Sequence, residues 1–185
     1  MSTRMERRWE RQTKKRRSVL RFAAELLAVI VLAALVRAFV FSITEVDGPS
    51  MQDTLHSGQI VAVEKLTCRF DGVQRGQIVI CRYPSSHGYY IKRVIALEGD
   101  TLEIRDGMTY LNGQALQEEY VTHPAQEDFG SVTVEPGHVF VLGDNRANSH
   151  DSRTEGTLAE SSIVGRAVCV LFPFDQIKTL NAPQE

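Results

Sequence analysis

Residues 46–55 of the chain have the sequence VDGPSMQDTL, in which a serine follows a Gly-Pro pair. Gly48 lets the backbone approach other groups closely and Pro49 fixes one backbone dihedral, so the pair predicts a turn that presents the Ser50 hydroxyl. Such a turn suits a nucleophile. Because most serines in this context are ordinary turn residues, the stretch by itself supports only a hypothesis of nucleophilic catalysis.

The stretch follows the one long apolar run of the chain, Phe22–Phe41. Twenty helical residues span about 30 Å, the thickness of the hydrocarbon core of a bilayer. The uncharged part, residues 26–36, is only 11 residues long and also fits a buried core helix or the apolar part of a signal peptide. Glu25 and Arg37 lie near the ends of the run, where long side chains reach the membrane interface, and no A-x-A cleavage site follows cleanly. We therefore predict an uncleaved transmembrane anchor over residues 18–43.

Charge is distributed unevenly along the chain. Residues 1–17 contain eight Lys or Arg against two Glu, whereas residues 44–185 contain 11 Lys or Arg against 20 Asp or Glu, a net charge of −9. Lys and Arg beside a membrane span favour the cytoplasmic side. We expect a basic cytoplasmic arm over residues 1–17, an extracytoplasmic domain over residues 44–175 and a tail over residues 176–185. The acidity of the domain disfavours binding to nucleic acid.

Short runs rich in Val and Ile, separated by glycine and turn residues, predict β-strands after the apolar run. The expected strands are residues 59–65, 77–83, 89–97, 101–105, 108–111, 139–142 and 163–172. Asp106-Gly107 and Asn112-Gly113 are strong signals for tight turns. The pattern predicts a mostly β domain, an antiparallel sandwich or open barrel, with a long loop over residues 113–136 and a frayed tail over residues 173–185.

Cysteine and histidine give no support for a metal site. The three cysteines form no C-x-x-C motif, and the five histidines lack the spacing of metal ligands. We expect Cys81 and Cys169, which lie in apolar runs, to be buried thiols.

Lys92 lies in the predicted strand 89–97, which has the sequence YYIKRVIAL. Side chains of a strand alternate between its two faces, so Lys92 and Arg93 point in opposite directions and one of them shares a face with mainly apolar neighbours. A lysine removed from water in this way has a lowered pKa and can act as a neutral base. The alternative, a solvent-exposed lysine on an edge strand, is the more common case and stays open at this point.

A third stretch, residues 143–153, has the sequence GDNRANSHDSR and directly follows the predicted strand 139–142. It is dense in groups that form hydrogen bonds. One interpretation is a structural loop held by Asp–Arg pairs and Asx turns. Another is a network that supports an active site.

Together, the three stretches and the N-terminal run resemble the type I signal peptidases, the membrane-bound Ser/Lys leader peptidases, in their compact Gram-positive-like form. The resemblance extends from the anchor to about Phe172 and rests on G-x-S-M-x-x-T-L at 48–55, YIKRV at 90–94 with Gly99-Asp100, and residues 143–153. It implies that Ser50 is the nucleophile and Lys92 the general base of a Ser–Lys dyad. The supporting residues that it implies are Ser149, which would orient the lysine, Met51, which would pack beneath the substrate cleft, and Asp144, Arg146, Asp151 and Arg153.

The resemblance also implies the reaction, hydrolysis of a peptide bond after small residues in exported preproteins at the surface of the lipid bilayer, with no metal or cofactor. The family's oxyanion hole uses the backbone N–H of the nucleophile, here Ser50. Some members add a serine hydroxyl where this chain has Gly48, so the second donor stays open. Other departures from common family residues are at Asp53, Gln59, Gln77 and Glu98.

Two other hypotheses stay open. LexA-like autoproteases also use a Ser/Lys pair, but they carry a DNA-binding domain where this chain has its apolar run. A non-enzymatic β domain that binds a partner at the membrane would need neither Ser50 nor Lys92. Self-cleavage without cleavage of preproteins would favour the first, and failure of a serine-directed inhibitor to label Ser50 would favour the second.

Overall fold

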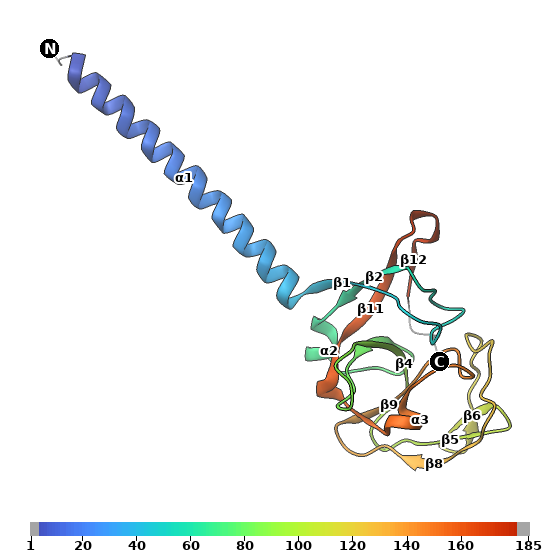
Figure 1. The fold of residues 1–185 in the computed structure, drawn as a ribbon. Helices are drawn as coiled ribbons and strands as arrows, with labels where there is room; N and C mark the ends of the chain where they lie inside the picture. The colour runs from blue at the N-terminus through green and yellow to red at the C-terminus, as the bar shows by residue number, and fades with distance from the viewer. Residues whose placement is uncertain (1–3, 181–185) are drawn as a thin grey trace. The chain divides into compact units, whose positions relative to one another are not determined.

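The computed structural model describes residues 4–180 of the 185-residue chain. Residues 1–3 of the predicted basic arm and residues 181–185 of the predicted tail lie outside the described residues. The chain divides into two compact units, Met1–Val40 and Phe41–Glu185. Among the described residues, the first unit contains one long helix and the second contains the strands (Figure 1).

Helix α1, Arg4–Phe39, makes up the first unit. Four successive positions point to all sides of a helix, yet the apolar side chains of residues 29–32 are each at least 49% exposed. Among the described residues, no helix is both long enough and apolar enough to cross a membrane. The predicted anchor over residues 18–43 therefore stays a prediction. Its last three residues, 41–43, belong to strand β1, Phe41–Glu45.

The second unit is built on an antiparallel sheet of eight strands in the order β1-β2-β11-β3-β4-β9-β10, with β12 also paired to β11. Strand β4 lies inside this sheet, between β3 and β9. The remaining strands of the sheet are β2 (Ile60–Glu64), β3 (Ile78–Cys81), β4 (Tyr90–Ala96), β9 (His138–Leu142), β10 (Leu158–Ala159), β11 (Ile163–Phe172) and β12 (Lys178–Thr179).

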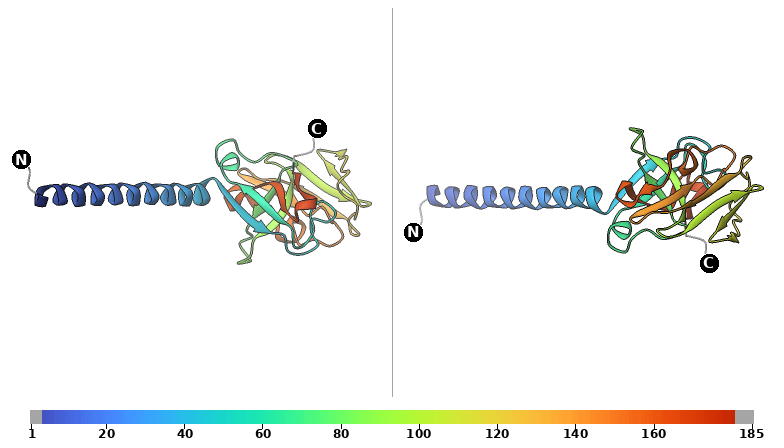
Figure 2. Two further views of the ribbon diagram at one scale, coloured as in Figure 1. Left: turned by 90° about the horizontal axis from the view of Figure 1, so that it is seen from above. Right: turned by 90° about the horizontal axis from the view of Figure 1, so that it is seen from below.

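A second antiparallel sheet has four strands in the order β7-β6-β5-β8. In both views of Figure 2 its yellow-green to orange strands lie together at one end of the β domain. Asp106 and Asn112, the first residues of the two predicted tight turns, have φ of 51° and 52°, and a glycine with positive φ follows each. The strands are β5 (Thr101–Arg105), β6 (Met108–Leu111), β7 (Gln114–Ala115) and β8 (Phe129–Thr133).

Short helical turns complete the domain. They are α2 (Leu66–Phe70), α3 (Ser152–Glu155), η1 (Glu160–Ser162) and η2 (Phe174–Gln176).

The mostly β, antiparallel prediction is confirmed, and each of the seven expected strands is present within two residues of its predicted ends. The loop expected over residues 113–136 is wrong in part, because it contains β7 and β8. Strand β8 has three exposed residues among five and so lacks a strong apolar pattern. The frayed tail is also wrong in part, since η2 and β12 lie in it.

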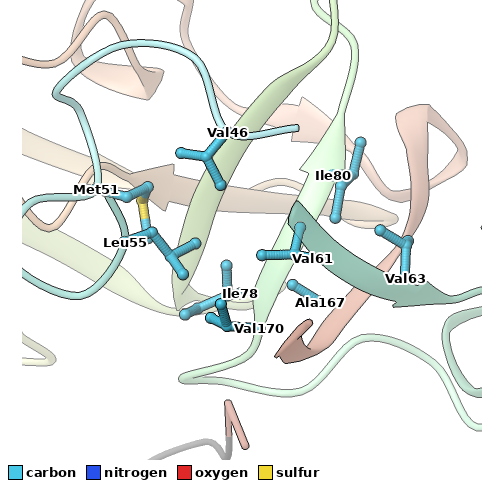
Figure 3. Packing of buried hydrophobic residues seen from close by; sticks show 9 residues of the cluster. All are labelled: Val46, Met51, Leu55, Val61, Val63, Ile78, Ile80, Ala167 and Val170. Carbon is cyan, nitrogen blue, oxygen red and sulfur yellow. The ribbon is translucent and has the colours of Figure 1, made fainter. Parts of the chain in front are cut away.

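Buried side chains cover both faces of the central strands. In β3, Ile78 and Ile80 belong to one apolar cluster, whereas Val79 and Cys81 belong to another. The first cluster also contains Met51 and Leu55, which follow Ser50 in the sequence, together with Val61 and Val170 (Figure 3). A strand buried on both faces reads as a continuous apolar run, as seen here, and any charged residue in it needs a partner.

Candidate active site

Hydrogen bonds to Ser57 and two buried side chains hold the turn that carries Ser50. Gly48 has φ of +90°, which favours glycine. Its N–H donates to Ser57 Oγ over 3.0 Å, and the Ser57 hydroxyl donates back to the Gly48 carbonyl over 3.1 Å. Met51 and Leu55 are 1% and 0% exposed and anchor the turn in the core. The Ser50 backbone therefore has little freedom to move.

Lys92 meets Ser50 directly. Its Nζ donates to Ser50 Oγ over 2.8 Å and to the Ile91 carbonyl over 3.1 Å. The alternative of an exposed edge-strand lysine is wrong, because β4 is paired on both sides and Lys92 is 2% exposed. Ser50 and Lys92, 42 positions apart in the sequence, thus form a part-buried contact pair.

Burial of the Lys92 amine lowers its pKa below the ordinary lysine value, because the charged form loses its hydration. The negative charges of Asp151 and Asp144 act in the opposite direction without cancelling this effect. A neutral lysine amine has a lone pair that can accept the hydroxyl proton of Ser50. The geometry therefore suits a nucleophile with its own base.

Arg93, the neighbour of Lys92, points to the other face of β4 and is also buried. Its guanidinium donates to both carboxylate oxygens of Asp144, over 2.8 and 2.6 Å, and to the Gly76 carbonyl over 2.9 Å. The Thr54 hydroxyl donates to the same carboxylate over 2.5 Å. Asp144 thus joins the strand of the base to the turn of the nucleophile.

Buried Asp151 and half-buried Arg153 form a second pair at the start of α3. Arg153 Nε and Nη2 donate to the Asp151 carboxylate over 2.8 and 2.9 Å, and the Gly143 N–H donates to it over 3.1 Å. Burial alone would raise the pKa of Asp151, but Arg153 and the backbone donor outweigh it and lower the pKa. Arg153 also donates to the Arg146 carbonyl over 2.8 Å, so it joins the start of α3 to the middle of the loop that follows β9.

Arg146 is buried and turned toward the second sheet. Its Nη1 and Nη2 donate to the Glu118 carboxylate over 2.9 and 2.6 Å, Nη1 donates to Thr109 Oγ1 over 2.5 Å, and Nε donates to the Gly143 carbonyl over 3.0 Å. Sequence reasoning missed Glu118, because it placed that residue in an unpatterned loop. A carboxylate that pairs across 28 positions leaves no local signal.

Two further residues that sequence reasoning missed hold the nucleophile's backbone. The Asn145 N–H donates to the Ser50 carbonyl over 3.1 Å, and its Nδ2 donates to the Pro49 carbonyl over 3.3 Å. At Gly143, an added Cβ would overlap both Ser149 Oγ and the Ser50 carbonyl oxygen. The glycine at the end of β9 was therefore a usable signal of close backbone approach.

The resemblance implies that Ser149 orients Lys92. Its Oγ is buried beside Gly143, and no hydrogen bond joins it to Lys92 within residues 4–180. The orienting contacts of the Lys92 amine are instead with Ser50 and the Ile91 carbonyl. The role of Ser149 stays a prediction.

Comparison with known proteins gives consistent matches along the chain. The family model described as "Signal peptidase, peptidase S26" matches residues 19–172. Signal peptidase I of Bacillus licheniformis is 38% identical over 181 residues, 91% of this chain and 97% of that protein. Probable signal peptidase I-1 of Synechocystis sp. is 42% identical over 156 residues, 80% of each chain. A solved signal peptidase I from Enterococcus faecalis V583 is 34% identical, with a TM-score of 0.47, over 51% of this chain and 95% of that chain.

Proposed function

Since the chain belongs to the signal peptidase family, peptidase S26, and is a serine peptidase, we propose that it removes signal peptides by an acyl-enzyme mechanism with Ser50 as nucleophile and Lys92 as base. The observation that carries the proposal is the 2.8 Å contact between Lys92 Nζ and Ser50 Oγ at a 2% exposed lysine. The substrates are preproteins that carry signal peptides.

The reaction follows from this pair. Neutral Lys92 accepts the Ser50 hydroxyl proton as Oγ attacks the carbonyl carbon of the scissile bond. Collapse of the tetrahedral intermediate breaks the C–N bond, and the lysine ammonium gives its proton to the departing amine. Lys92 then takes a proton from a water molecule that attacks the Ser50 ester, which releases the signal peptide and restores the serine.

The remaining site residues fix the positions of Ser50 and Lys92. Asp144 ties β4 to the nucleophile turn, and Asn145 holds the Ser50 carbonyl from the opposite side. Reacting groups held in the productive arrangement need no further ordering in the transition state, which contributes several kcal/mol to catalysis. The buried ion pairs support catalysis in this way, without taking part in proton transfer.

The test is cleavage of a model preprotein by the full chain. Ser50→Ala and Lys92→Met are each expected to lower kcat by about a thousand-fold or more, since dyad members act as a unit. The exposed Ser131→Ala on β8 is the matched control and should retain activity. Retained cleavage in either dyad variant would overturn the assignment. Self-cleavage of the chain with the preprotein left intact would favour a LexA-like autoprotease instead.

We further propose that α1 anchors the protein in the cell membrane, with residues 1–17 in the cytoplasm and the β domain outside. Two features support this: the apolar side chains exposed on all sides of residues 29–32 and the eight basic residues before them. The full chain should remain with membranes after carbonate extraction, and added protease should reach the β domain only from the outer side. Release by carbonate would refute the anchor.

A further inference from the structure

The connection between β7 and β8 contacts the turn after Ser50, the Arg93 side chain of β4 and the loop after β9. Its residues 118–123, here called the bracing segment, have no apolar period and were expected to be part of a long loop. The structure instead places their polar groups against the Ser50 turn, strand β4 and the loop after β9.

Glu118 makes the most buried of these contacts. Its side chain is 8% exposed and the Arg146 side chain 1% exposed, and two hydrogen bonds of 2.9 and 2.6 Å join them. Burial would raise the pKa of Glu118, but the hydrogen bonds and charge of Arg146 outweigh it and keep the carboxyl ionised. Arg146 Nε in turn holds the carbonyl of Gly143, whose Cα packs against the Ser50 carbonyl and Ser149.

Tyr120 makes the second contact. Its ring lies 3.9 Å below the Arg93 guanidinium, a cation–π distance, and its hydroxyl donates to Glu118 over 2.7 Å. Arg93 is the residue whose two hydrogen bonds fix Asp144. The bracing segment thereby covers the ion pair that joins β4 to the catalytic loop.

Thr122 and His123 make the third contact. The Thr122 hydroxyl donates to Asp53 Oδ2 over 2.9 Å, and His123 Nε2 lies 4.0 Å from the same oxygen. The His123 carbonyl accepts the Ala147 N–H over 3.2 Å, and His123 and Asn145 pair as a parallel bridge. Asp53 thus joins the nucleophile turn to a segment 69 positions away.

We propose that the bracing segment is a positioning element for the reaction of Ser50, with Glu118 as its principal positioning residue. The proposal rests on the Ser50–Lys92 mechanism above. Glu118 acts through Arg146 and Gly143 on the Ser50 backbone, and Thr122 acts through Asp53 on the same turn. A catalytic group displaced by about 1 Å can lose about a hundred-fold in rate, so a partial loosening of these contacts should be visible in kcat.

The first test compares Glu118→Gln with Glu64→Gln. Glu64 is a matched control, because its side chain is 11% exposed, pairs with Arg166 over 3.1 Å and lies in β2. Both variants lose a buried carboxylate partner of an arginine, so both should lose stability. At equal folded fraction, Glu118→Gln should lower kcat about ten-fold with KM and the acid midpoint of the pH profile unchanged, whereas Glu64→Gln should leave kcat within about two-fold.

The second test avoids the core. Thr122→Val removes only the exposed hydrogen bond to Asp53, and Thr133→Val removes a similar exposed bond of 3.0 Å to Thr101 on the second sheet. We expect kcat about three-fold lower for Thr122→Val at unchanged Tm, and no change for Thr133→Val. If Ser50→Ala is inactive but Glu118→Gln and Thr122→Val match their controls, the bracing role is overturned alone. If Ser50→Ala still cleaves the preprotein, the proposed mechanism is overturned and this inference with it.

Discussion

Replacement of Gly143 by alanine should separate catalytic geometry from stability. The added Cβ would lie 2.6 Å from Ser149 Cβ and would also overlap the Ser50 carbonyl oxygen. Comfortable carbon–carbon contact begins near about 3.5 Å, so Ser149 or the Ser50 turn must move by about 1 Å. Such a displacement at the nucleophile corresponds to about a hundred-fold loss in kcat, or about 2.7 kcal/mol of transition-state stabilisation.

The assay for Gly143→Ala is cleavage of a model preprotein, with kcat corrected for the folded fraction measured by circular dichroism. Gly165→Ala is the matched control, because its Cβ would lie 2.5 Å from the Glu64 carbonyl oxygen in strand pairing remote from Ser50. Both variants should be destabilised by overpacking, by about 1–3 kcal/mol. Only Gly143→Ala should lose the hundred-fold in kcat. Equal kcat values for the two folded variants would refute the close packing of Gly143 on the nucleophile as a determinant of rate.

Three further predictions concern charge. First, kcat/KM should rise with pH through a Lys92 pKa below the ordinary 10.5, because only the neutral amine is a base; a profile flat from mildly acidic to alkaline pH would contradict this. Second, Lys92→Met should raise Tm at pH 7, because the unfolded chain binds the lysine proton more tightly than the folded one. The gain should shrink as pH approaches 10.5 and wild-type stability rises, and an equal Tm at pH 7 would be inconsistent with a costly buried amine. Third, Asp144→Asn should lower the free energy of unfolding in urea by about 3–5 kcal/mol, since Arg93 is left buried with a weakened partner. Glu103→Gln at an exposed pair should cost less than about 1 kcal/mol, and similar losses in the two would refute this estimate.

The sequence predicted the core strands and missed those with weak apolar pattern. Strands β3 and β9 are buried on both faces, so their apolar runs are unambiguous. Strand β1 was merged with the anchor, because Phe41 and Ile43 are apolar although 47% and 60% exposed. The two-residue strands β7, β10 and β12 are too short to show any period.

In the site, too, residues with a sequence signal could be predicted and residues without one could not. The local patterns left the roles of Ser50 and Lys92 open, and the resemblance of three stretches to the signal peptidases pointed to them; the structure brings the two side chains to 2.8 Å. Asn145 and Glu118 could not be predicted, because their partners are 95 and 28 positions away and meet them only in the folded domain. The ion pairs were expected within residues 143–153, but two of the three arginine–carboxylate pairs reach outside that stretch.

The central claim is that Ser50 is the residue that becomes acylated. The most direct measurement is mass spectrometry of the full chain after reaction with a serine-directed penem inhibitor. One adduct per chain is predicted, on the peptide that contains Ser50, absent from Ser50→Ala and formed much more slowly in Lys92→Met. An adduct on another residue, or one that persists undiminished in Ser50→Ala, would contradict the claim.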